Sequence, residues 1–195
     1  AAHNVSRGNY ADIAREMITG ETLDVIMGCG HPLYDDNGRR VEPEADAYDY
    51  VGGRGLWRWL KAGRTDWTLI ETREDFERMA ALTPDEAGSA DKLRGRLLGV
   101  PRCHKTLQFG RDGEEFEPRN EHVPSLATMS VAALNVLAAR SDGAGGVLVI
   151  EGGAVDWANH ANNLPRMIEE QVEFNEAVEG VVRWVERHSS WEESL

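Results

Sequence analysis

Hydrophobic and polar positions along the chain alternate between the spacing of helices and that of short buried strands. Helical spacing of apolar residues predicts helices over residues 12–18, 56–61, 74–82, 124–139 and 164–187. Short apolar runs predict strands over residues 23–27, 68–70 and 96–100. Because strands and helices alternate, we expect an α/β layered fold with a central, mostly parallel sheet flanked by helices.

Two apolar segments in the second half of the chain carry more specific expectations. Residues 147–150 (VLVI) are apolar at every position, which is typical of a central parallel strand that is buried on both faces. In the last helix we expect an apolar stripe to face the core; its members are Ile168, Val172, Phe174, Val178, Val181, Val182 and Val185.

Composition favours one folded domain over residues 1–195, since 41% of the residues are hydrophobic. No apolar run approaches the roughly 20 residues that a membrane-spanning helix needs, so no membrane partner is expected. A net charge of −13 disfavours nucleic acid and anionic lipid as partners. Adaptation to salt and the ordinary acidity of many proteins explain this charge equally well.

The two cysteines, Cys29 and Cys103, leave the redox environment open. They fit a single disulfide in an exported protein, and they fit two free thiols equally well.

Candidate chemistry is concentrated just after residues 147–150. Glu151 would place a carboxylate at the carboxyl edge of a parallel sheet, where ligands bind in such folds. Gly152 and Gly153 allow a tight turn, and Asp156 and His160 share one face if the chain is helical there. A carboxylate and an imidazole converging in this way make half of a zinc site. By these residues alone, however, a helix cap and a solvated surface pair remain the simpler interpretation.

Residues 149–162 (VIEGGAVDWANHAN) resemble the alkaline phosphatase family, whose pattern here is an apolar strand, E-G-G/A and D-x-x-x-H. Three further segments are similar to the family in order and spacing. Pro124-Ser125-Leu126 matches its P-S-L helix start, residues 23–30 (LDVIMGCG) resemble D-V-I-L-G-G-G, and residues 2–7 (AHNVSR) resemble A-H-x-x-x-R. Cys29 stands where the family usually has glycine.

This resemblance implies roles for individual residues. Glu151 would bind a magnesium ion, and Asp156 with His160 would bind one of two catalytic zinc ions. Arg7 would grip the substrate phosphate, because a guanidinium offers paired donors in a planar fork. Trp157 departs from the best-known bacterial member, which has lysine after this aspartate, so the surroundings of phosphate and magnesium are expected to differ.

The implied function is hydrolysis of phosphate monoesters at alkaline pH, which releases an alcohol and inorganic phosphate. The resemblance also implies an exported homodimer, periplasmic or extracellular. The family's nucleophilic serine, a bridging aspartate and a magnesium-binding Ser/Thr would lie upstream of Arg7. A zinc-binding Asp-His pair and a final zinc-binding histidine would lie downstream of residue 195. We therefore expect an internal fragment that holds no catalytic nucleophile and is inactive in isolation.

Two alternatives remain open at this stage. The first is a related phosphodiesterase or sulfatase, although Arg7 together with Glu151 favours monoesters. The second is a non-catalytic metal-binding or scaffold fragment.

The remaining histidines and tryptophans are given structural interpretations. We expect His31 to be a surface-loop residue, and His104, His122 and His188 to be solvated. The five other tryptophans, Trp57, Trp59, Trp67, Trp184 and Trp191, are interpreted as packing residues.

Overall fold

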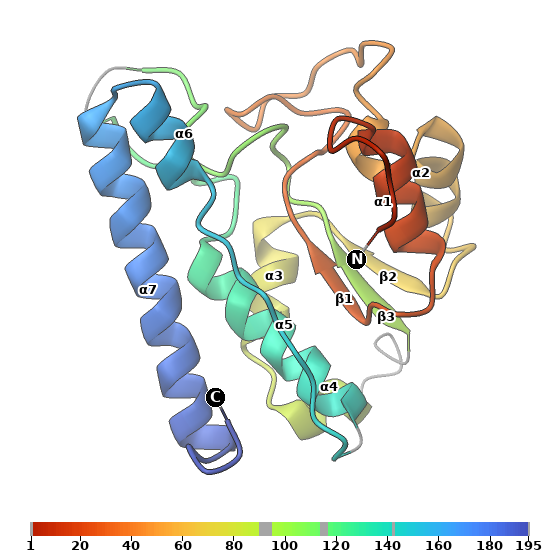
Figure 1. The fold of residues 1–195 in the computed structure, drawn as a ribbon, viewed down its shortest axis with the longest axis vertical. Coiled ribbons are helices and arrows are strands. Elements are labelled where there is room, and N and C mark those ends of the chain that lie inside the picture. The colour runs from red at the N-terminus through yellow and green to blue at the C-terminus, as the bar shows by residue number, and fades with distance from the viewer. Residues whose placement is uncertain (1, 90–94, 114–116, 142, 195) are drawn as a thin grey trace.

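The computed structural model describes residues 2–89, 95–113, 117–141 and 143–194. Its centre is a parallel sheet of three strands in the order β1-β3-β2 (Figure 1). The strands are β1 (Val25–Met27), β2 (Trp67–Ile70) and β3 (Arg96–Gly99), and each lies where the sequence predicts one. Residue 97 of β3 pairs with residue 25 on one side and with residue 68 on the other.

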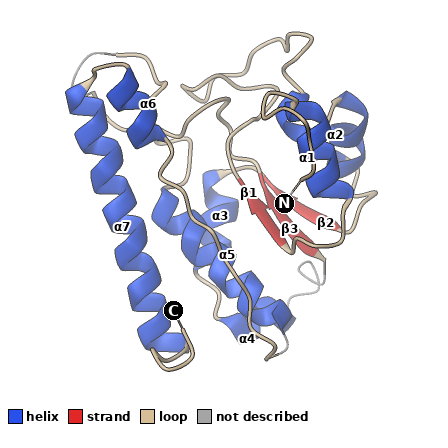
Figure 2. Ribbon diagram, in the orientation of Figure 1, coloured by secondary structure: helices blue, strands red, loops and turns tan. Residues whose placement is uncertain are grey.

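Helices cover both faces of this sheet, as the colouring in Figure 2 makes clear. They are α1 (Tyr10–Thr19), α2 (Arg54–Lys61), α3 (Arg73–Ala80), α4 (Pro84–Ser89), α5 (Leu126–Ser141), α6 (Ala154–His160) and α7 (Leu164–His188), with a short 3-10 helix η1 (Asp49–Val51). Helices α1 and α2 lie on one face and α3 to α5 on the other, and α7 packs outside α5 (Figure 1). The predicted α/β fold is confirmed. Neither α4 nor η1 was expected, since both are too short to show periodicity.

Strand β3 joins the two halves of the core. All four of its residues are buried. Leu98 packs with Ile18 and Trp57 in the cluster under α1 and α2, whereas Leu97 packs with Phe76 in the cluster under α3 and α5. Successive strand residues point to opposite faces, so one short strand supplies both clusters.

The expectation of a central strand at residues 147–150 is wrong. These residues form an extended segment outside any sheet, which crosses in front of α5 on its way to α6 (Figure 1). Val147 and Val149 are 89% and 85% exposed, while Leu148 and Ile150 are half-buried. A cavity separates the segment from β1, so no strand among the described residues is close enough to pair with it. An apolar run indicates that a segment can be buried, but it does not show which segment packs against it.

The apolar stripe expected along α7 is correct only in part. Ile168, Val172 and Val178 are exposed on this helix. Val185 is buried as expected, and Phe174, Val181 and Val182 are half-buried. The other buried positions of the helix are Arg166, Glu170, Glu173 and Ala177.

Charged side chains can lie on the inner face of α7 because some of their polar atoms form hydrogen bonds there. Arg111, itself buried, donates from Nη2 to both carboxylate oxygens of Glu169, at 2.8 and 2.9 Å. Glu173 Oε1 accepts from the backbone N–H of Leu126 at 2.9 Å, at the start of α5. Hydrogen bonds to charged groups are stronger than neutral ones, so they offset part of the cost of burying these side chains.

The expectation that the five other tryptophans are packing residues fails in part. Trp57 and Trp67 are core residues as expected, but Trp59 and Trp191 are more than half exposed.

None of the helices in the described ranges is both long and apolar enough to cross a bilayer.

Asn135, a buried residue of α5, links three helices by hydrogen bonds. Its Nδ2 donates to the carbonyls of Met79 at 3.1 Å and Leu82 at 2.6 Å, just where α3 ends. Its Oδ1 accepts from Trp184 Nε1 of α7 at 2.7 Å. One side-chain amide thus binds two carbonyls at the end of α3 and the indole N–H of Trp184.

We expect Asn135→Ala to lower the free energy of unfolding by about 2–4 kcal/mol, because the buried amide and its hydrogen bonds to α3 and α7 are lost. Urea unfolding measures this change. Asn175→Ala is the matched control, since Asn175 is exposed on α7, and it should change stability by less than about 0.5 kcal/mol. Equal stability of the two variants would contradict the role given to Asn135.

Candidate metal and phosphate site

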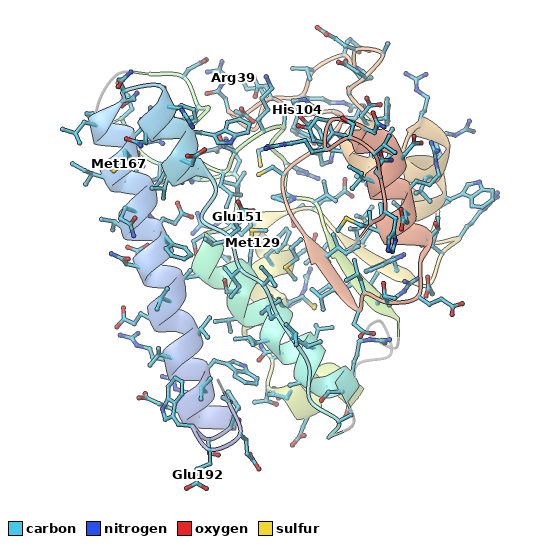
Figure 3. The ribbon with its side chains drawn as sticks, in the orientation of Figure 1. Arg39, His104, Met129, Glu151, Met167 and Glu192 are labelled. Atoms are coloured by element: carbon cyan, nitrogen blue, oxygen red, sulfur yellow. The ribbon has the colours of Figure 1, made fainter. Side chains whose placement is uncertain are left out.

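A central cavity of about 510 Å³ lies along β1 and beyond its carboxyl end. Its wall is formed by the loop after β1, the first turns of α5, residues 148–154 and part of α7. Glu151 and Met129, both labelled in Figure 3, belong to this wall. Glu151 therefore faces the same cavity as the end of β1, although an extended segment brings it there and not a strand of its own.

Gly152 allows the loop that carries Glu151 to lie directly on α7. A Cβ atom at this position would come within 2.7 Å of Cδ2 of Phe174, which is closer than side chains pack. Gly153 then caps the N-terminus of α6. The two glycines thus bring backbone close to a neighbouring helix, and through this contact the position of Glu151 is tied to α7.

Asp156 and His160 form a pair on α6, as their spacing predicts. Asp156 Oδ1 lies 3.5 Å from His160 Nε2, and the two side chains are 70% and 81% exposed. No group of three or more metal-binding side chains occurs among the residues that the structure describes. The pair therefore offers two donors on one open face, which fits half of a zinc coordination sphere.

Trp157 connects this pair to the cavity. It follows Asp156 on α6, is 47% exposed and belongs to the cavity wall together with Glu151. The structure thus places the predicted residues Glu151, Asp156, Trp157 and His160 on one short stretch of chain, of which Glu151 and Trp157 line the cavity.

Arg7 lies elsewhere, on the exposed segment that leads into α1. His3 anchors this segment by donating its backbone N–H to Glu16 Oε2 at 2.9 Å. Within the segment, Asn9 Nδ2 donates a hydrogen bond to Asn4 Oδ1 at 2.7 Å. Arg7 is not among the residues of the central cavity wall. Its role as a phosphate ligand stays a prediction.

Two cavity residues that the sequence analysis missed are Glu170 and Glu173 of α7. Both are more than nine-tenths buried, and Glu170 Oε1 and Glu173 Oε2 find no hydrogen-bond partner within the described ranges. Burial, followed by the charges of Glu173 and Glu169, raises the pKa of Glu170 to about 7. Burial likewise raises the pKa of Glu173. Charged residues on a helix are normally solvated, so their sequence pattern gave no signal.

His31 is buried, so the expectation of a surface-loop residue is wrong. Its Nδ1 accepts from the backbone N–H of Leu33 at 3.1 Å, which leaves Nε2 to donate to Glu71 Oε1 at 2.8 Å. The rings of Tyr34 and Trp57 pack edge-on against the imidazole. Both ring nitrogens are occupied inside the fold, so His31 has a structural role.

Glu170 makes stability depend on pH with a defined sign. Its pKa is raised in the fold, so the folded chain keeps a proton that the unfolded chain loses as pH rises from 4.5 to about 7. Stability therefore falls over this window. Glu170→Gln removes the buried charge and should be more stabilising at about pH 8 than at about pH 5, by about 1–3 kcal/mol.

Urea unfolding of wild type and Glu170→Gln at both pH values measures this difference. Glu186→Gln, an exposed change on the same helix, is the control and should show none. If the Glu170→Gln effect is the same at both pH values, then the side chain does not titrate in this window.

Comparison with known proteins extends these observations to the whole chain. A family model described as alkaline phosphatase matches residues 1–190. The repressible alkaline phosphatase of Saccharomyces cerevisiae is 25% identical over 177 residues, which cover 86% of this chain and 28% of the yeast protein. Alkaline phosphatase 4 of Drosophila melanogaster is 27% identical over 192 residues, which cover 91% of this chain and 29% of the fly protein. The chain thus spans less than a third of the length of these curated relatives. It belongs to the alkaline phosphatase family.

Proposed function

We propose that this chain supplies part of the metal and phosphate site of an enzyme that hydrolyses phosphate monoesters to an alcohol and inorganic phosphate. The observation that carries the proposal is the Asp156–His160 pair at 3.5 Å, on the helix that directly follows Glu151 and the two glycines. Family membership supports phosphate ester hydrolysis as the chemistry. The family's relatives act as longer proteins, so the activity is proposed for a protein that contains this chain together with further segments.

In this proposal Asp156 Oδ1 and His160 Nε2 bind one zinc ion of a two-zinc site, and Glu151 binds magnesium. The donors fit these ions, since zinc accepts carboxylate oxygen and imidazole nitrogen whereas magnesium prefers oxygen. When bound, the metals supply positive charge that stabilises the attacking and leaving oxygens of the phosphoryl group. The chain's own contribution is to orient the ligands: α6 fixes the Asp156–His160 spacing, and Gly152 sets Glu151 against α7.

Arg7 completes the proposed part of the site by binding two phosphate oxygens. Its planar guanidinium matches the geometry of a phosphate group with two parallel hydrogen bonds. A monoester leaves three oxygens free for such contacts, which favours monoesters over the diesters and sulfate esters of related enzymes. An exported homodimer remains part of the proposal on the strength of the family resemblance.

The metal half-site is tested in a full-length alkaline phosphatase that contains this sequence. We expect Asp156→Ala and His160→Ala each to lower zinc content and to reduce kcat/KM by at least about 100-fold, since each removes a direct ligand. Glu151→Ala should instead weaken the dependence of activity on magnesium. Zinc is measured by atomic emission and activity with a chromogenic monoester. His188→Ala, at the exposed end of α7, serves as the control and should retain both properties.

Unchanged zinc content in both the Asp156 and the His160 variants would contradict the proposal. The pair would then be an ordinary surface contact on α6.

For Arg7 we expect the alanine variant of the same full-length protein to lose about ten- to a thousandfold in kcat/KM, because a bidentate charged contact is removed while the metals remain. Inhibition by inorganic phosphate should weaken in parallel, since product makes the same contact. Lysine at this position should restore only part of the loss, because a point charge cannot reproduce the planar fork. Wild-type phosphate inhibition together with wild-type kcat/KM in Arg7→Ala would show that Arg7 does not bind phosphate.

A further inference from the structure

We propose that Cys29 and Cys103 are a modification site: a thiol pair that closes to a disulfide and cross-links the loops after β1 and β3. The two sulfur atoms lie 3.2 Å apart, with the Cys103 thiol donating to the Cys29 sulfur. A disulfide bond is about 2.05 Å long, so the sulfurs need to approach by only about 1 Å. The pair lies 74 residues apart in sequence, and the parallel pairing of β1 with β3 brings it together.

Backbone hydrogen bonds already hold the two loops in the arrangement that the bond requires. The N–H of Gly28 donates to the carbonyl of Gly99 at 3.0 Å. On the other side of Cys29, the N–H groups of Gly30 and His31 donate to the carbonyl of Cys103 at 3.3 and 3.0 Å. Cys29 is therefore fixed from both sides against the segment that carries its partner, so the two thiols are held as neighbours.

The two thiols differ in access, which sets the order in which they react. Cys29 is half-buried and belongs to the wall of the central cavity, which opens to solvent. Cys103 is fully buried. Its hydrogen bond to Cys29 and its burial raise the pKa of the Cys103 thiol well above its usual range. Cys103 therefore stays protonated and reacts second, after Cys29.

The chemistry is thiol–disulfide exchange with a small disulfide such as oxidised glutathione. Cys29, as its thiolate, attacks one sulfur of glutathione disulfide, so that a mixed disulfide forms and one glutathione thiolate leaves. Cys103 then attacks the Cys29 sulfur and releases the second glutathione, which takes up the proton from Cys103. The protein loses two protons and two electrons, and the glutathione disulfide gains them to become two molecules of glutathione.

This inference is independent of the proposed function, because it depends only on the two loops and not on any metal or substrate. Its consequence is structural. A bond that closes a loop of this length restricts the unfolded chain strongly and should raise the melting temperature by about 5–10 °C. In an oxidising compartment the bond would form as the chain folds.

The experiment compares the reduced 195-residue chain before and after incubation with oxidised glutathione. We expect the intact mass to fall by two hydrogens, both free thiols to disappear from a thiol titration, and a peptide digest to yield one fragment that joins Cys29 to Cys103. The oxidised chain should also melt higher than the reduced one. A folded chain that keeps both thiols free, or that forms only intermolecular disulfides, would overturn the proposal.

Single variants test the order of reaction under native conditions, with circular dichroism to show that each is folded. Cys103→Ser should stop at the mixed disulfide and gain the mass of one glutathionyl group. Cys29→Ser should react at least tenfold more slowly, because the remaining thiol is buried. Equal rates in the two folded variants would overturn the assigned order. If neither variant folds, the wild-type mass and peptide measurements alone still decide whether the bond forms.

Discussion

The position of β3 between β1 and β2 is the constraint on which the rest of the structure depends. Because both pairings are parallel, the carboxyl ends of all three strands meet at one edge, and the loops that leave β1 and β3 become neighbours. Arg96 at the start of β3 secures this arrangement, since its guanidinium binds both carboxylate oxygens of Asp66, at 2.8 and 2.9 Å. The central cavity and the cysteine pair are both consequences of this one edge.

Helix α7 adds a second constraint, and it is electrostatic as much as apolar. Glu169 is bound by Arg111, and Glu173 caps the start of α5, so the helix is held by its charged face. Glu170 lacks such full compensation, which is why its carboxyl keeps a proton to a higher pH than usual. Phe174 of the same helix contacts Gly152, so the position of α7 also sets the position of Glu151. The candidate site and the buried acids are therefore parts of one packed unit.

Much of the local structure could be predicted from the sequence. Apolar periodicity located the three strands and the long helices to within a few residues, because local sequence spacing sets which faces can be buried. The spacing of Asp156 and His160 likewise predicted their contact, since residues four apart share a helical face. The match to alkaline phosphatases also followed from short motifs, in which residue identity and order carry the information.

Tertiary structure alone decided which surfaces meet. Residues 147–150 are as apolar as a central strand, yet pairing needs a neighbouring strand at hydrogen-bonding distance, and local sequence does not state where that neighbour lies. The inner face of α7 was misjudged for a related reason, since buried carboxylates are stabilised by partners such as Arg111 and Leu126, distant in sequence. The closeness of Cys29 and Cys103 is likewise a contact between residues distant in sequence, which local spacing does not predict. The sequence by itself determined most of the elements, their order and the family. Contacts between elements distant along the chain, which depend on register and packing, were determined only by the folded structure.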